Sequence, residues 1–115
     1  MSRWGMFKIL IAEDDSLSQR FVAAIIEHMG HAPFVSPNGY HAWDALTAEN
    51  HFDLLITDMM MPGMDGYQVC TALKADARTQ HIPVVMVTAL TDSTERVRGL
   101  DVGADDFLSK PVDDA

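Results

Sequence analysis

Three short apolar runs, rich in β-branched side chains, constrain the fold of this chain most. They cover residues 7–12, 52–58 and 83–88. Near-continuous apolar runs of this length are typical of strands that are buried on both faces of a parallel sheet. Segments with a helical spacing of apolar residues separate them, so strands and helices alternate. The alternation predicts an α/β fold with an open parallel sheet and helices on both of its faces.

Weaker signals complete the set of expected elements. Helices are expected near residues 16–29, 40–49, 67–75 and 93–100, and two further strands near 32–36 and 106–110. Ser16 lies three positions before Gln19, which is the spacing of a capping box at the start of the first helix. That helix carries an apolar stripe made of Phe21, Val22, Ile25, Ile26 and Met29. Pro33 and Pro37 place the strand between them at an edge of the sheet.

The composition limits the classes of protein that fit. A length of 115 residues is the size of one domain with a core that needs no disulfide. The formal net charge of −9 argues against nucleic-acid binding by this domain, because phosphate contacts need Lys and Arg. The single Cys70 cannot form an intrachain disulfide and fits a reducing, cytoplasmic compartment. We see no secretory segment and expect no contact with a membrane.

Polar side chains stand at the carboxyl ends of four of these strands. They are Glu13 and Asp14 after the first strand, and Asp58, Thr88 and Lys110 at the ends of three later strands. The carboxyl ends of parallel strands meet at one edge of a sheet, and functional groups gather there. We therefore expect all five side chains to converge at one place.

Three carboxylates at one place repel each other, by roughly 4 kcal/mol for two charges about 4 Å apart at an effective dielectric near 20. Such a set suits a hard divalent cation. Mg²⁺ fits best, because it combines one or two carboxylates with waters and a phosphate oxygen. The hydroxyl of Thr88 and the ammonium of Lys110 would bind and neutralise a phosphoryl group. Together these groups indicate phosphoryl transfer onto a carboxylate.

Simpler interpretations apply to several motifs. Acidic residues in a loop are usually exposed and nothing more, and we keep this interpretation for Asp15. The methionines at 59–61 and Met64 are interpreted as adaptable core filler rather than as metal ligands, because Mg²⁺ avoids sulfur. Cys70 is interpreted as a small core residue. The five histidines show no metal-ligand spacing and receive no role.

Four motifs, in order along the chain, resemble those of the receiver domain of bacterial two-component response regulators. They are AEDDS after the first strand, TDMMMPGMDG after the third, VTAL after the fourth and DDFLSKP at the fifth. The resemblance covers nearly the whole chain. It implies a flavodoxin-like sheet of five parallel strands in the order 2-1-3-4-5. It also implies a signalling switch that catalyses only its own phosphorylation and dephosphorylation, rather than an enzyme.

By this resemblance Asp58 is the phosphoacceptor, and its phosphate comes from a phosphohistidine on a sensor histidine kinase or from a phosphotransfer protein. Asp14 and Asp58 would bind Mg²⁺ directly, and Glu13 would bind it through a water. The backbone carbonyl of Met60 would be the third direct ligand, and Mn²⁺ is an alternative ion. Many relatives carry Asp where this chain has Glu13, and the longer side chain changes its reach.

The resemblance also implies a phosphate site and a switch. Thr88, Ala89 and Lys110 would bind the phosphoryl group, and the bond between Lys110 and Pro111 would be cis, as only X–Pro bonds readily are. Thr88 would turn towards the phosphate, and Phe107 would rotate into the space behind it. This change would carry the signal to an output domain or a partner.

The resemblance assigns the tuning of dephosphorylation to Met60 and Leu90. Neither side chain can orient an attacking water by hydrogen bonding, and both add apolar cover. We therefore expect a comparatively long-lived phosphorylated state.

The end of the chain departs from the family pattern. Relatives usually continue with a fifth helix, whereas this chain stops at Ala115. We therefore expect residues 1–115 to form a receiver domain truncated before that helix, followed in a longer protein by a C-terminal output domain. The segment GADDFLSKPVDD resembles receivers fused to diguanylate cyclases. Without a fifth helix the stripe on the first helix would lie open, which predicts marginal stability or pairing with a neighbour.

Other functions are compatible with a similar fold. The main alternative is a Mg²⁺-dependent phosphatase with an aspartyl nucleophile, but its general acid would stand two positions after Asp58, where this chain has Met60. A flavodoxin-like FMN carrier needs a hydroxyl- and glycine-rich phosphate loop after the first strand, where this chain has acids. A degenerate receiver that binds partners without phosphorylation is disfavoured by the intact Asp58, Thr88 and Lys110.

Overall fold

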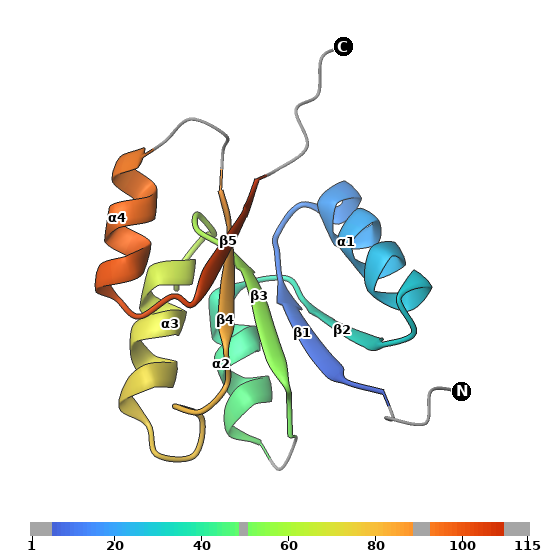
Figure 1. Ribbon diagram of the computed structural model, residues 1–115, viewed down its shortest axis with the longest axis horizontal. Helices are drawn as coiled ribbons and strands as arrows, with labels where there is room; N and C mark the ends of the chain where they lie inside the picture. Colours follow the sequence, from blue (N-terminus) through green and yellow to red (C-terminus); the bar gives the residue numbers. More distant parts are fainter. Residues whose placement is uncertain (1–5, 49–50, 89–92, 110–115) are drawn as a thin grey trace.

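The computed structural model describes residues 6–48, 51–88 and 93–109. Strands and helices alternate along them, as the sequence predicts (Figure 1). The strands are β1 (Lys8–Ala12), β2 (Ala32–Ser36), β3 (Leu54–Asp58), β4 (Val84–Thr88) and β5 (Asp106–Ser109). The helices are α1 (Ser16–His28), α2 (Gly39–Thr47), α3 (Gly66–Ala75) and α4 (Ser93–Asp101).

The five strands form one parallel sheet in the order β2-β1-β3-β4-β5. This confirms the expected flavodoxin-like topology, and it confirms that β2 lies at an edge. The register pairs Ala12 at the end of β1 with Thr57 of β3, and it pairs Asp58 of β3 with Val87 of β4. The carboxyl ends of the central strands are therefore aligned by the hydrogen-bond ladder, and the side chains that follow them emerge at one edge.

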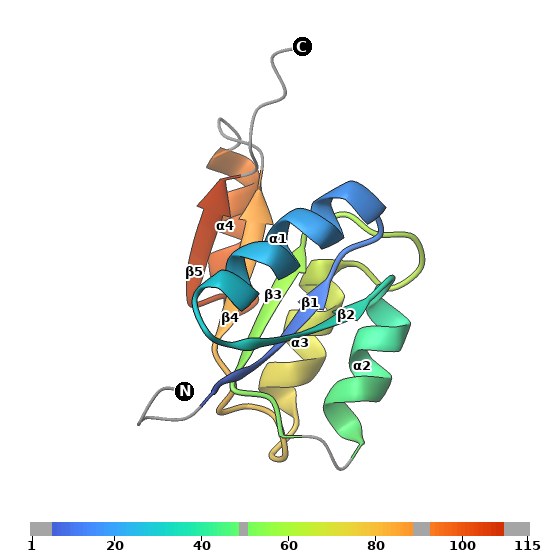
Figure 2. The same ribbon diagram turned by 90° about the vertical axis from the view of Figure 1, so that its right-hand side faces the viewer.

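Helices cover both faces of the sheet, and each face has its own core cluster (Figure 2). On one face α2 and α3 pack over the larger cluster, which includes Leu10, Leu55 and Met86. On this face α4 also approaches closely, since a Cβ on Gly99 would lie 2.7 Å from the ring of Phe107. On the other face α1 packs over a smaller cluster made of Ile9, Ile11, Ile26 and Ile56.

The inward faces of α2 and α3 agree with the sequence prediction. Val69, Cys70 and Leu73 are fully buried and Leu46 is nearly so, whereas Trp43 is partly buried against the same core. Burial raises the pKa of the Cys70 thiol to about 11. The thiol is therefore neutral at pH 7 and packs as a small core residue, as interpreted from the sequence.

The apolar stripe on α1 is only partly covered. Ile26 is buried, and Val22 packs against the smaller core cluster. Phe21, Ile25 and Met29 are between 44% and 63% exposed. The expectation of an uncovered stripe therefore holds for the outer half of that face, and its effect on stability and association stays a prediction.

The start of α1 differs from the sequence prediction. Asp15 is the residue that caps the helix, and its side chain accepts a hydrogen bond of 2.8 Å from the N–H of Ser18. The amide of Gln19 donates instead to the carbonyl oxygen of Glu13 at 2.6 Å. The predicted capping box at Ser16 is therefore wrong, because an acid one position earlier reaches the orphan N–H groups.

The elements are short, and some begin at other residues than expected. β3 begins at Leu54 rather than at residue 52, and α2 begins at Gly39, where the Asn38 side chain accepts from the N–H of His41. The longest helix described has 13 residues. No helix within the described residues has the length and apolar character needed to cross a membrane.

Gly66 allows α3 to begin directly behind the end of β3. Its N–H donates to the carbonyl oxygen of Met59 at 3.0 Å, and a Cβ at this position would overlap the carbonyl oxygen of Asp58. The overlapping atoms belong to the backbone, so they cannot turn aside as the end of a flexible side chain can. A side chain at position 66 would therefore displace the chain that carries Asp58.

The substitution Gly66→Ala should destabilise the fold more than Gly30→Ala does. Gly30 has a φ of +88° with open space around it, so its replacement costs only about 1–2 kcal/mol of backbone strain. At position 66 overpacking against backbone should cost roughly 3 kcal/mol. Urea unfolding followed by circular dichroism measures both losses. Equal losses would show that α3 can move away from β3 without penalty.

An ion pair ties α3 to the segment between α4 and β5. Lys74 Nζ donates to Asp105 at 2.9 Å and to the carbonyl oxygen of Ile82 at 3.3 Å, and the Asp105 carboxylate also accepts from the N–H of Val84 at 2.8 Å. Partial burial alone would raise the pKa of Asp105, but the hydrogen bonds from Lys74 and Val84 outweigh it. The pKa of Asp105 therefore lies below its ordinary value.

The contribution of Asp105 to stability should depend on pH. A carboxyl whose pKa is lowered by folding stabilises the native state above its ordinary pKa of 3.8, and this stabilisation is lost as the pH falls through the folded pKa. We expect Asp105→Asn to lower the free energy of unfolding at pH 7, by less than about 1 kcal/mol because the pair is half exposed. Urea unfolding at pH 7 and pH 3 should show the difference from wild type shrinking at pH 3. A difference that stays constant, or equal losses in the exposed control Asp101→Asn, would contradict this role.

Candidate functional site

Three carboxylates meet at the carboxyl edge of the sheet. Glu13 and Asp14 follow β1, and Asp58 ends β3. One oxygen from each of the three lies within 4.8 Å of the others. We call these three residues the acidic cluster. Glu13 and Asp58 are only 4% and 6% exposed, whereas Asp14 is exposed.

Backbone hydrogen bonds hold Glu13 on both sides. Its N–H donates to the carbonyl oxygen of Ser36 at 3.0 Å, and its carbonyl oxygen accepts from Gln19. Its carboxylate accepts from the N–H of Asp15 at 3.3 Å. Asp15 itself caps α1, so its side chain is directed into the helix start, in agreement with the interpretation that it lies away from a metal.

The end of β3 and the tight loop after it orient Asp58. The N–H of Met59 donates to Oδ1 of Asp58 at 2.8 Å, and the hydroxyl of Thr57 donates to its carbonyl oxygen at 2.9 Å. The loop then enters α3 at a capping box in which Asp65 and Gln68 bond each other's N–H groups. The carboxylate of Asp58 is therefore set by backbone geometry.

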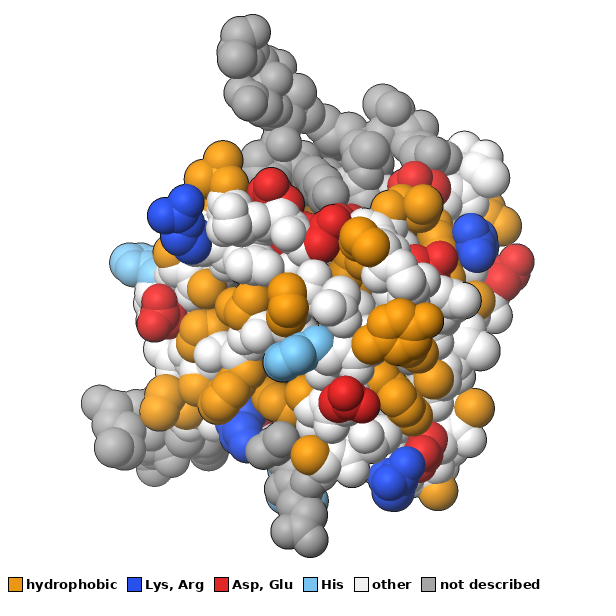
Figure 3. Space-filling view, turned by 180° about the vertical axis from the view of Figure 1, so that it is seen from behind, with side chains coloured by type: hydrophobic (Ala, Val, Ile, Leu, Met, Phe, Trp, Pro, Cys, Tyr) orange, Lys and Arg blue, Asp and Glu red, His pale blue; other side chains and the backbone are white. Residues whose placement is uncertain are grey.

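The acidic cluster carries an electrostatic cost when its members are ionised. Two unit charges about 5 Å apart repel by roughly 3 kcal/mol at an effective dielectric near 20. Acidic side chains also gather towards this edge of the molecule in the space-filling view (Figure 3). A hard divalent cation with oxygen ligands would turn the repulsion into attraction, so the residues present fit Mg²⁺ chemically.

The hydroxyl of Thr88 lies at the end of β4, on the same edge. Thr88 is 1% exposed, and its hydroxyl donates to a carboxylate oxygen of Glu95 on α4 at 3.4 Å. The carbonyl oxygen of Glu95 accepts in turn from the Tyr67 hydroxyl of α3 at 3.3 Å. Sequence reasoning identified Thr88 but not Glu95 or Tyr67. A spacing of seven residues between Thr88 and Glu95, across a polar segment, carries no periodic signal.

Phe107 lies behind this edge, on β5. It is half-buried, packs against the larger core cluster, and touches α4 at Gly99. The Met60 side chain is 63% exposed, so unlike the buried Met59 and Met61 it fills no core space. The other predicted site residues, Ala89, Leu90 and Lys110, lie outside the described residues, as does the bond from Lys110 to Pro111.

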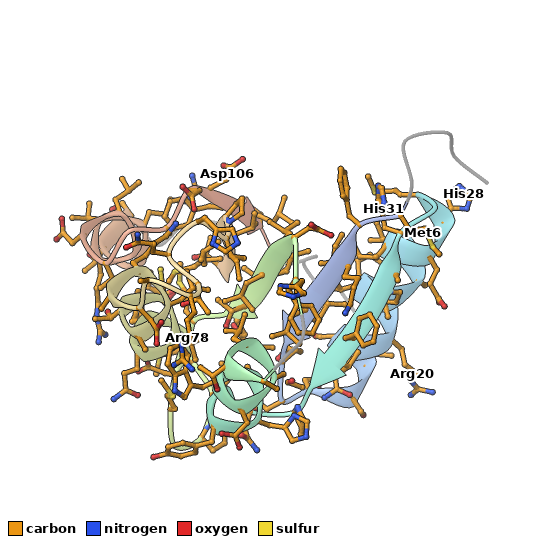
Figure 4. The ribbon with its side chains drawn as sticks, turned by 90° about the horizontal axis from the view of Figure 1, so that it is seen from below. Met6, Arg20, His28, His31, Arg78 and Asp106 are labelled. Carbon is orange, nitrogen blue, oxygen red and sulfur yellow. The ribbon has the colours of Figure 1, made fainter. Side chains whose placement is uncertain are left out.

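The acidic cluster is distinct from the other metal-binding residue types. Within residues 6–48, 51–88 and 93–109 no other three His, Cys, Asp or Glu residues come together in this way. His28 and His31 lie near the end of α1 and the start of β2, with Met6 beside them (Figure 4). His31 stacks on Phe7 there and accepts from its N–H. This agrees with the absence of metal-ligand spacing among the histidines.

Comparisons with known proteins agree with the fold and with the order of the motifs. The chain matches the response regulator receiver domain family over residues 9–115. Response regulator PleD of Caulobacter vibrioides is 41% identical over 107 residues, which cover 93% of this chain and 23% of PleD. The chain spans less than half the length of curated relatives such as this one.

Solved structures show the same architecture. The signal receiver domain of a signal transduction histidine kinase from Syntrophus aciditrophicus is 39% identical, with a TM-score of 0.83 over 94% of this chain and 81% of that chain. The N-terminal domain of a response regulator receiver protein from Methanoculleus marisnigri is 29% identical, with a TM-score of 0.83 over 94% and 87%. Sequence, topology and structural likeness thus lead to one conclusion: the chain belongs to the response regulator receiver domain family.

Proposed function

We propose that this chain is a phosphorylation-dependent switch that accepts a phosphoryl group on Asp58. The observation that carries the proposal is the position of Asp58, buried at the end of β3 and within 4.8 Å of Glu13 and Asp14. Receiver domains interact with histidine kinases. The donor would therefore be a sensor histidine kinase or a phosphotransfer protein that carries phosphohistidine.

In the proposed reaction a carboxylate oxygen of Asp58 forms a bond to the phosphorus of the donor. The P–N bond of the phosphohistidine breaks, and the imidazole nitrogen leaves with the electron pair and takes up a proton. The product is an acyl phosphate on Asp58. The N–H of Met59 supports this step, because it holds one carboxylate oxygen and so orients the other.

The acidic cluster would hold Mg²⁺ for this reaction, with Mn²⁺ as an alternative ion. Asp14 and Asp58 would bind directly, Glu13 through a water, and the backbone carbonyl of Met60 would add a further ligand. The oxygen donor set supports this assignment. A bound divalent cation neutralises charge on the phosphoryl oxygens during transfer. Glu13 is buried and held through its backbone, so it keeps the edge in place.

After transfer, Thr88, Ala89 and Lys110 would bind the phosphoryl oxygens. Thr88 is well placed for this, since it ends the strand next to β3. Phe107 would then move towards the space that Thr88 leaves. Its half-buried position against the core and α4 supports a role in passing the change to an output domain or a partner.

Hydrolysis of the acyl phosphate would be slow. Met60 and Leu90, at the tuning positions, cannot direct a water at the phosphorus. The switch would work in the cytoplasm, where its kinase partners place their phosphohistidines. It would not contact nucleic acid itself, since the net charge is −9, and an output domain would supply any such contact.

Asp58 should be the only site of acyl phosphate. Incubation with acetyl phosphate and Mg²⁺ should add one phosphate by intact mass, and Asp58→Asn should abolish it because the nucleophilic carboxylate is lost. Asp44→Asn, an exposed acid at the end of α2, is the matched control and should label normally. Undiminished labelling of Asp58→Asn would overturn the assignment.

Binding of Mg²⁺ should depend on Asp14 far more than on Asp15. Asp14→Asn removes a ligand, so affinity measured by titration calorimetry should fall more than roughly tenfold. Asp15→Asn keeps the cap of α1, because Asn caps helices as well as Asp does, and should bind nearly as wild type. Asp14→Asn should also raise stability without metal by relieving repulsion. Equal losses of affinity in the two variants would contradict this order.

A further inference from the structure

The Thr88 hydroxyl has a specific acceptor on α4, and this contact has a consequence for the proposed function, on which the inference rests. The hydroxyl donates to a carboxylate oxygen of Glu95 at 3.4 Å. A hydroxyl carries a single hydrogen and can donate it to only one acceptor at a time. While Thr88 donates to Glu95, it cannot donate to a phosphoryl oxygen on Asp58.

The backbone around Glu95 is tied to the body of the domain. Tyr67 of α3 is buried, and its hydroxyl donates to the Glu95 carbonyl oxygen at 3.3 Å and to the sulfur of Met59 at 3.3 Å. The guanidinium of Arg98, one turn along α4, lies 4.0 Å from the centre of the Tyr67 ring. The Glu95 carboxylate is therefore presented to Thr88 by a first turn of α4 that is anchored on α3.

The distance of this contact suits a bond that must be broken. Strong hydrogen bonds between a hydroxyl and an oxygen are typically about 2.7 Å long, and a contact of 3.4 Å is weak. A phosphoryl oxygen carries a full charge and could accept a shorter bond. Competition between the two acceptors would then favour phosphate once Asp58 is modified.

We propose that Glu95 is an autoinhibitory residue that holds the Thr88 hydroxyl in the unphosphorylated state. Phosphorylation of Asp58 withdraws the hydroxyl from Glu95 and detaches the first turn of α4 from the end of β4. Tyr67 carries this change to the groove between α3 and α4, which has a volume of about 340 Å³ and is lined by Tyr67, Arg98 and Val102. Glu95 is thus a positioning residue, and it sets how readily the switch turns on.

The test measures binding of beryllofluoride, a phosphoryl mimic, in the presence of Mg²⁺ by titration calorimetry. Glu95→Ala frees the hydroxyl and should tighten the apparent affinity roughly three- to tenfold, as expected for one weak hydrogen bond to a charged group. Glu95→Gln keeps an acceptor oxygen and should give a smaller gain. Glu27→Gln, which removes an exposed charge on α1, should match wild type. No gain in Glu95→Ala would overturn the inference.

A double-mutant cycle separates the hydrogen bond from simple charge repulsion. Thr88→Val removes the hydroxyl at nearly constant size, so Glu95→Ala should bring no gain in that background. If the same gain persists there, Glu95 acts by its charge alone and the inference is wrong. If wild type takes no phosphate on Asp58 and binds no beryllofluoride, the proposed function fails and the inference falls with it.

Discussion

Repulsion among the carboxylates of the acidic cluster is the constraint on which the rest of the structure depends. Side chains of like charge separate when they can, and these three stay within 4.8 Å because strong backbone geometry holds them. The parallel ladder aligns the ends of β1 and β3, and Glu13 is bonded through its N–H and its carbonyl oxygen. The sheet therefore stores an electrostatic cost that a cation and a phosphoryl group would relieve.

The region around α4 is built differently from that edge. The acidic cluster rests on ladder hydrogen bonds, whereas α4 meets the end of β4 through a long side-chain contact, from Thr88 to Glu95. Further along, α4 touches β5 at a glycine, Gly99, beside the ring of Phe107. A rigid edge next to a weakly attached helix is the arrangement that a two-state switch needs, because only the weak contact has to change.

Much of the fold and of the acidic site could be predicted from the sequence. Apolar runs of five or six residues between helical patterns leave few topologies, and the carboxyl ends of parallel strands always meet at one edge. This is why the strand ends alone were enough to group Glu13, Asp14 and Asp58. The same reasoning missed the cap of α1, since Asp15 and Ser16 are both good caps and only the path of the chain decides between them.

The sequence by itself determined the alternation of strands and helices, the order of the motifs and the identity of the acids at the strand ends. It could do so because these features depend on local periodicity and on the general geometry of parallel sheets. Only the tertiary structure decided that Glu13 is buried while Asp14 is exposed, and that the hydroxyl of Thr88 meets Glu95. Those facts depend on how α1 and α4 sit on the sheet, which is set by long-range packing that no short stretch of sequence encodes.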